Sequence, residues 1–486
     1  MRAVAAALLV LMLGLASPVS ALASQHWFKA YKASGDEKIW AVKTLEDGRI
    51  IAVGSILRNQ TPRHEDALVM MLSPEGKVLW AKTFDNGGDD RFEDAVIAKN
   101  GDIVAVGFTS GPDKNSDVLV IRMTQDGEVL WEKTYGGKKS DWASGVTVSE
   151  IGDIIVAAST KSFGAGDTDI WVLRLKGDGE VLWSRTYGTK DFEKTMAVAL
   201  APNGDITVAG VRGFLDGLVL RLDGNGNLIW AKSYGGSGTD WLFDVVVTEN
   251  GSIITAGSTD SFGKNMEDAW IMELDSRGEV LWTKTYGQSN DDSAEGIALL
   301  GDRILVAGTS YLFNEGRDDV LLFSVDMDGN LIWKVCYGGS GFEEAFAIDT
   351  GGDGSIVVGG HLEDSGSIGD DVLLIRLPGV GALGNCELEK KIDMHELDVP
   401  FKVVGLNFTS TEPKVNGVVV HLDEKSWNGE ERILCEFKAV LTQNSQKIIS
   451  ESHSPASSKA QASEKSGGIC GPAFFIVLAL ALRRLF

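Results

Sequence analysis

About ten residues after each of seven tryptophans, this sequence carries a carboxylate. The set is Asp36, Asp90, Asp141, Asp191, Asp240, Asp292 and Glu343. Carboxylates that meet from separate segments can bind Ca²⁺ or another hard cation through their oxygens. Alternatively, each side chain accepts hydrogen bonds from the amides of a local turn, and recurrence in every unit favours this structural role. The sequence alone leaves both roles open.

Other patterns of catalytic or metal-binding residues are absent from the sequence. No pair of the 6 histidines has zinc-finger or helical metal-site spacing, so no zinc site is expected. There is no Gly-x-Ser-x-Gly elbow and no phosphate-binding loop. Two calcium-loop-like segments, Asp223–Asn227 and Asp326–Asn330, lack the downstream acidic ligand and predict hairpin turns. We therefore predict no catalytic residues and no cofactor, with Ca²⁺ at the carboxylates as the one metal candidate.

The charge of the chain restricts its partners. Asp and Glu total 69 against 45 Lys and Arg, which gives a net charge of −24. An acidic surface without a basic stripe repels polyphosphates, so nucleic acid is not an expected partner.

The carboxylates belong to a repeat whose most constant member is a tryptophan. The tryptophans return at intervals of 47 to 53 residues, as Trp27, Trp80, Trp131, Trp183, Trp230, Trp282 and Trp333. An aspartate lies 14 residues before each of the last six. Asp371 has no tryptophan after it, and Trp27 has no aspartate before it. Asp371 and Trp27 complete one unit only if the start of the chain pairs with its end, as in a closed ring.

Each unit carries the signals of four β-strands. The segment Asp117–Tyr135 is two apolar runs joined by a turn, with a glycine four residues before the tryptophan. A second hairpin follows, in most units with an Asn-Gly or Asp-Gly turn such as Asn100-Gly101. Seven such units predict an all-β fold, a seven-bladed β-propeller over residues 24–378. The first strand would close it by pairing with the last repeat strand, around residues 371–377.

The tryptophans are expected to be structural anchors. Each indole would fill the wedge between neighbouring blades, where a large apolar group is needed. Segments such as "LSPEGKVLW", "LKGDGEVLW" and "LDSRGEVLW" resemble the tryptophan-docking motif of quinoprotein-like propellers. This resemblance covers about residues 26–378 and implies the fold. It transfers little about function, because propellers host many unrelated activities.

Both ends of the chain predict export. Residues 1–23 have the layout of a cleaved signal peptide: a basic residue, an apolar run and small residues at Ala21 and Ala23. The alternative is an uncleaved membrane anchor. At the other end, residues 469–486 resemble the CGP-CTERM sorting signal of hyperthermophilic archaeal (Thermococcales-like) surface proteins, through Cys470, Gly471 and Pro472 followed by an apolar run and two arginines. That resemblance implies processing of the tail, or attachment of a lipid to Cys470.

Between the propeller and this tail, the sequence predicts two further segments. Residues 379–441 contain strand-like pieces and are expected to form a small β appendage, and residues 442–468 are Ser/Ala/Lys-rich and predict a disordered stalk. In an exported chain, Cys386 and Cys435 are expected to form a disulfide, with free buried thiols as the alternative. Cys336 is expected to be a lone packed thiol. Asn59 and Asn407 are candidate glycosylation sites, and Asn250 lies in a tight turn.

Together these patterns predict an exported, surface-tethered, monomeric propeller. Its expected role is non-enzymatic: a binding or structural platform for an extracellular protein or glycan, with the ligand surface in the variable loops. One alternative is an exported quinoprotein-like enzyme that uses the propeller channel. A second alternative is a scaffold for the assembly of envelope proteins.

Overall fold

The computed structural model describes residues 26–381 except 34, 59–63, 112–114, 264–265, 288–289, 312–317 and 364–368, and the backbone of seven short strands between residues 389 and 436. All of these residues belong to the first of two compact units, residues 1–438. The predicted signal peptide, stalk and sorting tail lie outside the described residues. No helix in the described part of the chain is long and apolar enough to span a membrane.

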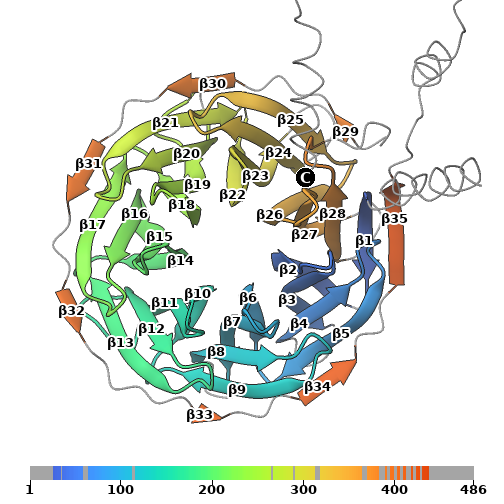
Figure 1. Cartoon of the computed structure of the whole chain (residues 1–486), viewed down its shortest axis with the longest axis horizontal. Helices are drawn as coiled ribbons and strands as arrows, with labels where there is room; N and C mark the ends of the chain where they lie inside the picture. Colours follow the sequence, from blue (N-terminus) through green and yellow to red (C-terminus); the bar gives the residue numbers. More distant parts are fainter. Residues whose placement is uncertain are drawn as a thin grey trace, which may run out of the picture. The chain divides into compact units, whose positions relative to one another are not determined.

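Seven antiparallel blades form a ring around a channel (Figure 1). Blade 1 consists of β2 (Gly35–Thr44), β3 (Ile50–Arg58), β4 (His64–Leu72) and β5 (Val78–Asp85). Blade 2 consists of β6 (Asp90–Ile97), β7 (Ile103–Ser110), β8 (Ser116–Met123) and β9 (Val129–Tyr135). Blade 3 consists of β10 (Asp141–Val148), β11 (Ile154–Thr160), β12 (Asp169–Leu175) and β13 (Val181–Gly188).

The remaining blades repeat this order from the channel outward. Blade 4 consists of β14 (Glu193–Leu200), β15 (Ile206–Arg212), β16 (Asp216–Leu222) and β17 (Leu228–Gly235). Blade 5 consists of β18 (Asp240–Val247), β19 (Ile253–Thr259), β20 (Asp268–Leu274) and β21 (Val280–Gly287). Blade 6 consists of β22 (Asp292–Leu300), β23 (Arg303–Tyr311), β24 (Asp318–Asp326) and β25 (Leu331–Tyr337). Blade 7 consists of β26 (Phe342–Thr350), β27 (Ile356–Glu363), β28 (Asp371–Leu377) and, from the start of the chain, β1 (Trp27–Lys32).

Blade 7 closes the ring in the way the sequence predicts. Its outer strand β1 pairs antiparallel with β28, with Trp27 opposite Arg376 and Tyr31 opposite Val372. The unpaired tryptophan and the unpaired aspartate of the repeat therefore belong to one blade. This pairing confirms the seven-bladed β-propeller, because a linear array would leave the two strands apart.

The structure corrects the prediction of a small β appendage at residues 379–441. The strands between residues 389 and 436, called the belt here, do not form a sheet of their own; each adds a fifth strand to one blade. They are β29 (Glu389–Lys390), β30 (His395–Asp398), β31 (Lys402–Gly405), β32 (Thr409–Thr411), β33 (Val418–Val419), β34 (Asp423–Ser426) and β35 (Glu430–Glu436). The belt meets blades 6, 5, 4, 3, 2, 1 and then 7, so it runs around the ring against the order of the blades (Figure 1). The physical reason is that an uncovered outer strand exposes unpaired N–H and C=O groups.

The core lies between adjacent blades. Every residue of β11 and of β19 is buried, as expected for strands covered on both faces. Phe84 of blade 1 packs edge to face on Phe92 of blade 2, with ring centroids 5.8 Å apart. Each blade thus buries its apolar face only against its neighbour.

The repeated tryptophans dock each blade onto the next. Trp27 donates its indole N–H to the Pro74 carbonyl oxygen at 2.9 Å, and the Tyr31 hydroxyl donates to Gly76 O at 2.6 Å. Both acceptors lie in the β4–β5 turn of the next blade around the ring. The same indole hydrogen bonds join Trp80 to Gln125, Trp131 to Gly177, Trp183 to Gly224, Trp230 to Ser276 and Trp282 to Met327.

The turn that receives each docked indole contains a glycine with a positive φ. Gly76 has a φ of +76°, and a Cβ there would lie 2.6 Å from Cε2 of Trp27. At the closure, Trp333 docks on Gly381, which has a φ of +80° and would place a Cβ 2.3 Å from Cη2 of that indole. The segment after β28 therefore begins with the turn that completes the seventh dock.

Replacing Gly76 by alanine tests this docking. We compare it with Gly204→Ala, whose φ of +85° is equally unfavourable but whose Cβ would meet nothing within 4 Å. Both variants lose about 1 kcal/mol to the left-handed backbone. Gly76→Ala should lose a further ~1–3 kcal/mol of unfolding free energy, because the added methyl group displaces a packed indole. Denaturant unfolding measures both losses, and equal losses would contradict the dock.

Candidate functional site

Each of the seven inner strands carries a β-bulge at the same place. One residue of the inner strand has no partner in the next strand at the register shift, between Ile39 and Ala41 in blade 1 for example. The seven bulged residues are Trp40, Glu93, Ser144, Met196, Phe243, Glu295 and Phe346. Bulges bend a strand and redirect a side chain, and they are common next to functional sites.

All seven bulged residues line one cavity of about 530 Å³ in the channel. The cavity wall is completed by Arg91, Phe108, Ser116, Trp142 and Lys194. The bulged residues differ in type from blade to blade, whereas the docking tryptophans are invariant. Because the repeat does not require these side chains for its own packing, they are positions at which the seven blades are free to differ. We treat this cavity as the candidate functional site.

One part of the wall combines aromatic rings with basic side chains. Trp40 stacks on Phe346, with centroids 4.6 Å apart and an interplanar angle of 20°. The Arg91 guanidinium lies 4.9 Å from the centroid of a Trp40 ring and forms an ion pair of 2.7 Å with Glu65. The ion pair fixes the guanidinium over the ring, so this part of the wall is rigid and offers both an apolar face and hydrogen-bond donors.

An adjoining part of the wall is acidic, and Phe346 belongs to both parts. A second cavity, of about 310 Å³, shares Phe243, Glu295 and Phe346 with the first. Its other lining carboxylates are Glu267, Asp291, Asp292, Asp318 and Glu344.

Enclosure in this acidic part changes the pKa values of the carboxyl groups. Burial raises the pKa of Glu295 to about 7, and the charges of Glu267 and Glu344 raise it too. Burial also raises the pKa of Glu344 to about 7, and Asp318 is the next cause. These groups therefore take up and release protons near neutral pH, and a bound cation would favour their charged forms.

A lysine and three carboxylates link blades along the inner strands. Lys43 has its Nζ 3.9 Å from Oδ1 of Asp94, and the charges of Asp349 and Asp244 also act on it. The three carboxylates accept backbone N–H groups from the next blade: Asp94 from Val146 at 2.9 Å, Asp244 from Ile297 at 2.9 Å and Asp349 from Thr44 at 2.6 Å. This cluster is therefore already engaged in holding blades together.

The carboxylates predicted as a ring prove to be turn acceptors. Asp141 accepts the N–H of Gly137 at 2.8 Å, and Asp240 accepts that of Gly236 at 2.8 Å. Asp90 and Glu343 accept turn amides in the same way, and Asp292 begins its inner strand at the same position. Each lies in its own blade, and within the described residues no three of the set come close enough to share one ion.

In two blades a neighbour of the predicted residue accepts the turn amide. In blades 1 and 4 the turn acceptor is Glu37, which accepts Gly35 N–H at 2.9 Å, and Glu193, which accepts Thr189 N–H at 3.1 Å. Asp36 and Asp191 lie beside them, and exposed Asp191 pairs with Arg212 instead. Which residue accepts the turn amide therefore depends on the strand register and not on the distance from the tryptophan. Counting from the corrected carboxylates, every bulged residue lies three positions later, a spacing that could have revealed the channel residues.

The other predicted site residues have mixed outcomes. The seven tryptophan anchors lie on the outer strands, and Cys336 is a buried thiol. Asn59, Cys386, Asn407 and the segment Cys470-Gly471-Pro472 lie outside the described residues, as does the side chain of Cys435. Asn250 lies in the β18–β19 turn, where its Oδ1 accepts the Ser252 N–H at 3.1 Å.

Comparisons with known proteins give only distant structural likenesses. No family model and no curated protein matches the chain. Among solved structures, it is similar to the polysaccharide lyase Uly1, with 10% identity over 70% of this chain and 90% of that chain and a TM-score of 0.43. It is also similar to a mutant puromycin hydrolase (14% identity, 68% of this chain and 50% of that chain, TM-score 0.44) and to a mutant NanB sialidase from Streptococcus pneumoniae (11%, 71% and 68%, TM-score 0.36). Likenesses this distant carry no argument about the activity of this chain.

The raised pKa of Glu295 predicts a pH-dependent stability. The native group ionises near pH 7 instead of 4.5, so between these values the native state binds more protons than the unfolded state and stability falls as the pH rises. Glu295→Gln mimics the protonated group. It should resemble the wild type at pH 4 and be more stable by about 1–3 kcal/mol at pH 8.

Urea unfolding at the two pH values measures this difference. The exposed Glu128→Gln is the control and should show no such change with pH. A Glu295→Gln variant that differs from the wild type equally at both pH values would contradict the role of burial.

Proposed function

We propose that the protein is an exported, non-enzymatic binding protein whose small ligand occupies the channel. The observation that carries this proposal is the set of seven bulged side chains, one per blade, directed into one cavity of about 530 Å³. A volume of this size is typical of small-molecule sites. Divergence at seven equivalent positions that all face one cavity is what selection for a ligand would produce.

The lining indicates the chemistry of the ligand. Aromatic faces of Trp40, Trp142 and Phe346 suit a flat apolar surface, and Arg91 and Lys194 are donors for acidic or hydroxyl groups. Glu93 and Glu295 are acceptors on the same wall. A charged, saccharide-sized molecule satisfies all of these groups at once. The proposal thus places the ligand in the channel, whereas the sequence suggested the loops.

Export and surface attachment are part of this proposal and rest on the sequence of the two ends. Residues 1–23 would direct secretion, and residues 469–486 would be processed or would anchor the chain. With the Ser/Ala/Lys-rich residues 442–468 between ring and anchor, the channel would be presented away from the cell surface.

Binding to neutral, acidic and amino sugars and their short oligomers tests the ligand class. We expect a ligand detected by isothermal titration calorimetry to bind Phe243→Ala at least tenfold more weakly, because the bulge then loses its aromatic wall. Leu281→Ala is a matched control in the same blade, since Leu281 is 57% exposed on the outer strand β21. Equal weakening by both variants, or tight binding unaffected by either, would place the ligand elsewhere. Stoichiometric uptake of pyrroloquinoline quinone would instead support the quinoprotein-like enzyme.

The belt gives the predicted disulfide a specific role. Cys386 precedes β29 by three residues, and Cys435 lies in β35. These strands belong to the neighbouring blades 6 and 7, so the belt ends next to where it began. A Cys386–Cys435 bond would lock the belt around the ring.

Mass spectrometry of the oxidised, exported protein should find this pair. Reduction, or a Cys386→Ser/Cys435→Ser double variant, should lower the unfolding free energy by about 2–4 kcal/mol. Two free thiols at these positions in the exported protein would refute the bond.

A further inference from the structure

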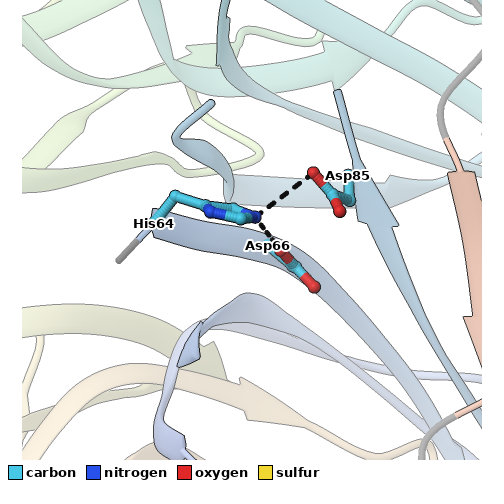
Figure 2. A group of neighbouring side chains, drawn as sticks. All are labelled: His64, Asp66 and Asp85. Atoms are coloured by element: carbon cyan, nitrogen blue, oxygen red, sulfur yellow. Dashed lines mark ion pairs between the residues drawn. The ribbon is translucent and has the colours of Figure 1, made fainter. Parts of the chain in front are cut away.

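A group of possible metal ligands lies in blade 1, away from the channel. Figure 2 shows His64 and Asp66 on β4 and Asp85 at the end of β5, with one imidazole nitrogen facing both carboxylates. Because side chains alternate along a strand, His64 and Asp66 share one face. The β4–β5 pairing runs from Ala67 opposite Phe84, which brings Asp85 to the same end of the blade. Local strand geometry therefore assembles the three groups.

The distances between these groups suit a tetrahedral ion. His64 Nε2 lies 3.3 Å from Oδ1 of Asp66 and 3.4 Å from Oδ1 of Asp85. Zinc bonds to nitrogen and oxygen of about 2.0–2.2 Å place tetrahedral ligands about 3.3–3.6 Å apart. A single imidazole N–H cannot point well at two carboxylate oxygens, whereas an ion between the three atoms would contact all of them.

The buried carboxylate of Asp66 points to a ligand independently. Asp66 is 0% exposed, and its Oδ1 makes no hydrogen bond within the described part of the chain. Arg58 contacts the other oxygen, Oδ2, and also donates to Thr83 Oγ1 at 2.8 Å. Arg58 therefore holds the carboxylate with Oδ1 facing His64. A buried acceptor without a donor is costly, and a metal ion would satisfy it.

Blade 1 also departs from the repeat at this place. In five blades the residue after the outer-strand tyrosine is a glycine: Gly136, Gly188, Gly235, Gly287 and Gly338. A Cβ at Gly136 would lie 1.9 Å from Oδ1 of Asp117, so the repeat carboxylate normally fills this space. In blade 7 the residue is Lys32, which pairs with Asp371 at 2.8 Å. Only blade 1 has a second carboxylate, Asp85, at this position. The positive charge of Arg58 neutralises just one of the two carboxylates, Asp66 and Asp85.

We infer that His64 Nε2, Asp66 Oδ1 and Asp85 Oδ1 bind a divalent transition-metal ion of the zinc type. A water molecule takes the fourth position of the tetrahedron. The side chains of His64, Asp66 and Asp85 are 15%, 0% and 14% exposed, so the ion is reached from one side. The site is separate from the channel and does not depend on the ligand proposed there.

Metal uptake by the full, tag-free chain tests the inference. Protein stripped with chelator and dialysed is titrated with Zn²⁺ by calorimetry, and bound metal is counted by mass spectrometry. We expect one tightly bound Zn²⁺ per chain. His64→Ala and Asp85→Gly should each bind it at least tenfold more weakly. Asp85→Gly restores the residue of five other blades and should fold, and Asp126→Asn, an exposed carboxylate in a turn, should bind as the wild type does.

Cobalt supplies a second readout. Co²⁺ in the wild type should give the intense visible absorption of a tetrahedral ion, and Asp85→Gly should lack it. Wild type and Asp85→Gly that take up Zn²⁺ with the same stoichiometry and affinity would overturn the inference. So would a wild type that binds no Zn²⁺.

Discussion

The fold depends on one interaction, the docking of an outer-strand indole onto the glycine turn of the next blade. The indole and the glycine turn of each contact belong to two different blades. A blade is therefore fully packed only when its neighbours are present. A row of such units always leaves one indole and one turn unmatched. The ring removes this defect, since Trp27 reaches Gly76 and Trp333 reaches Gly381. The β1–β28 pairing and the turn that follows β28 are therefore two parts of one closure.

The separation between packing contacts and channel-lining residues explains which positions of the sequence are free to vary. The outer strands and the blade interfaces carry the packing, and the belt covers the outer edges. The inner strands contribute their turn carboxylates, their pairing and contacts between blades such as that of Asp94 with Val146. A bulge in each inner strand then exposes one side chain to the channel without disturbing the core. Function can diverge there at little cost in stability, which is why residues as different as Ser144, Met196 and Glu295 occupy equivalent positions.

Departures from the repeat are informative only when strand register is known. Asp191 and Glu193 are both acidic and nearly adjacent, yet only Glu193 accepts the turn amide. Asp85 looks like one more surface carboxylate until it is compared with the glycine that five other blades have at its position. The role of Asp85 depends on two neighbouring residues. Asp66 is the aspartate that recurs in every blade, and His64 is a histidine that no other blade has at the equivalent place.

The sequence by itself determined the number of blades, the four strands of each and the closure of the ring, because these follow from local spacing repeated seven times. It also identified the docking tryptophans. The tertiary structure alone decided the path of the belt, since β29 and β33 have two residues each and show no periodicity. It alone brought Trp40, Phe243 and Phe346 to one cavity and His64, Asp66 and Asp85 to one point. Contacts of this kind arise from ring closure and strand register, which pair residues that no local pattern connects.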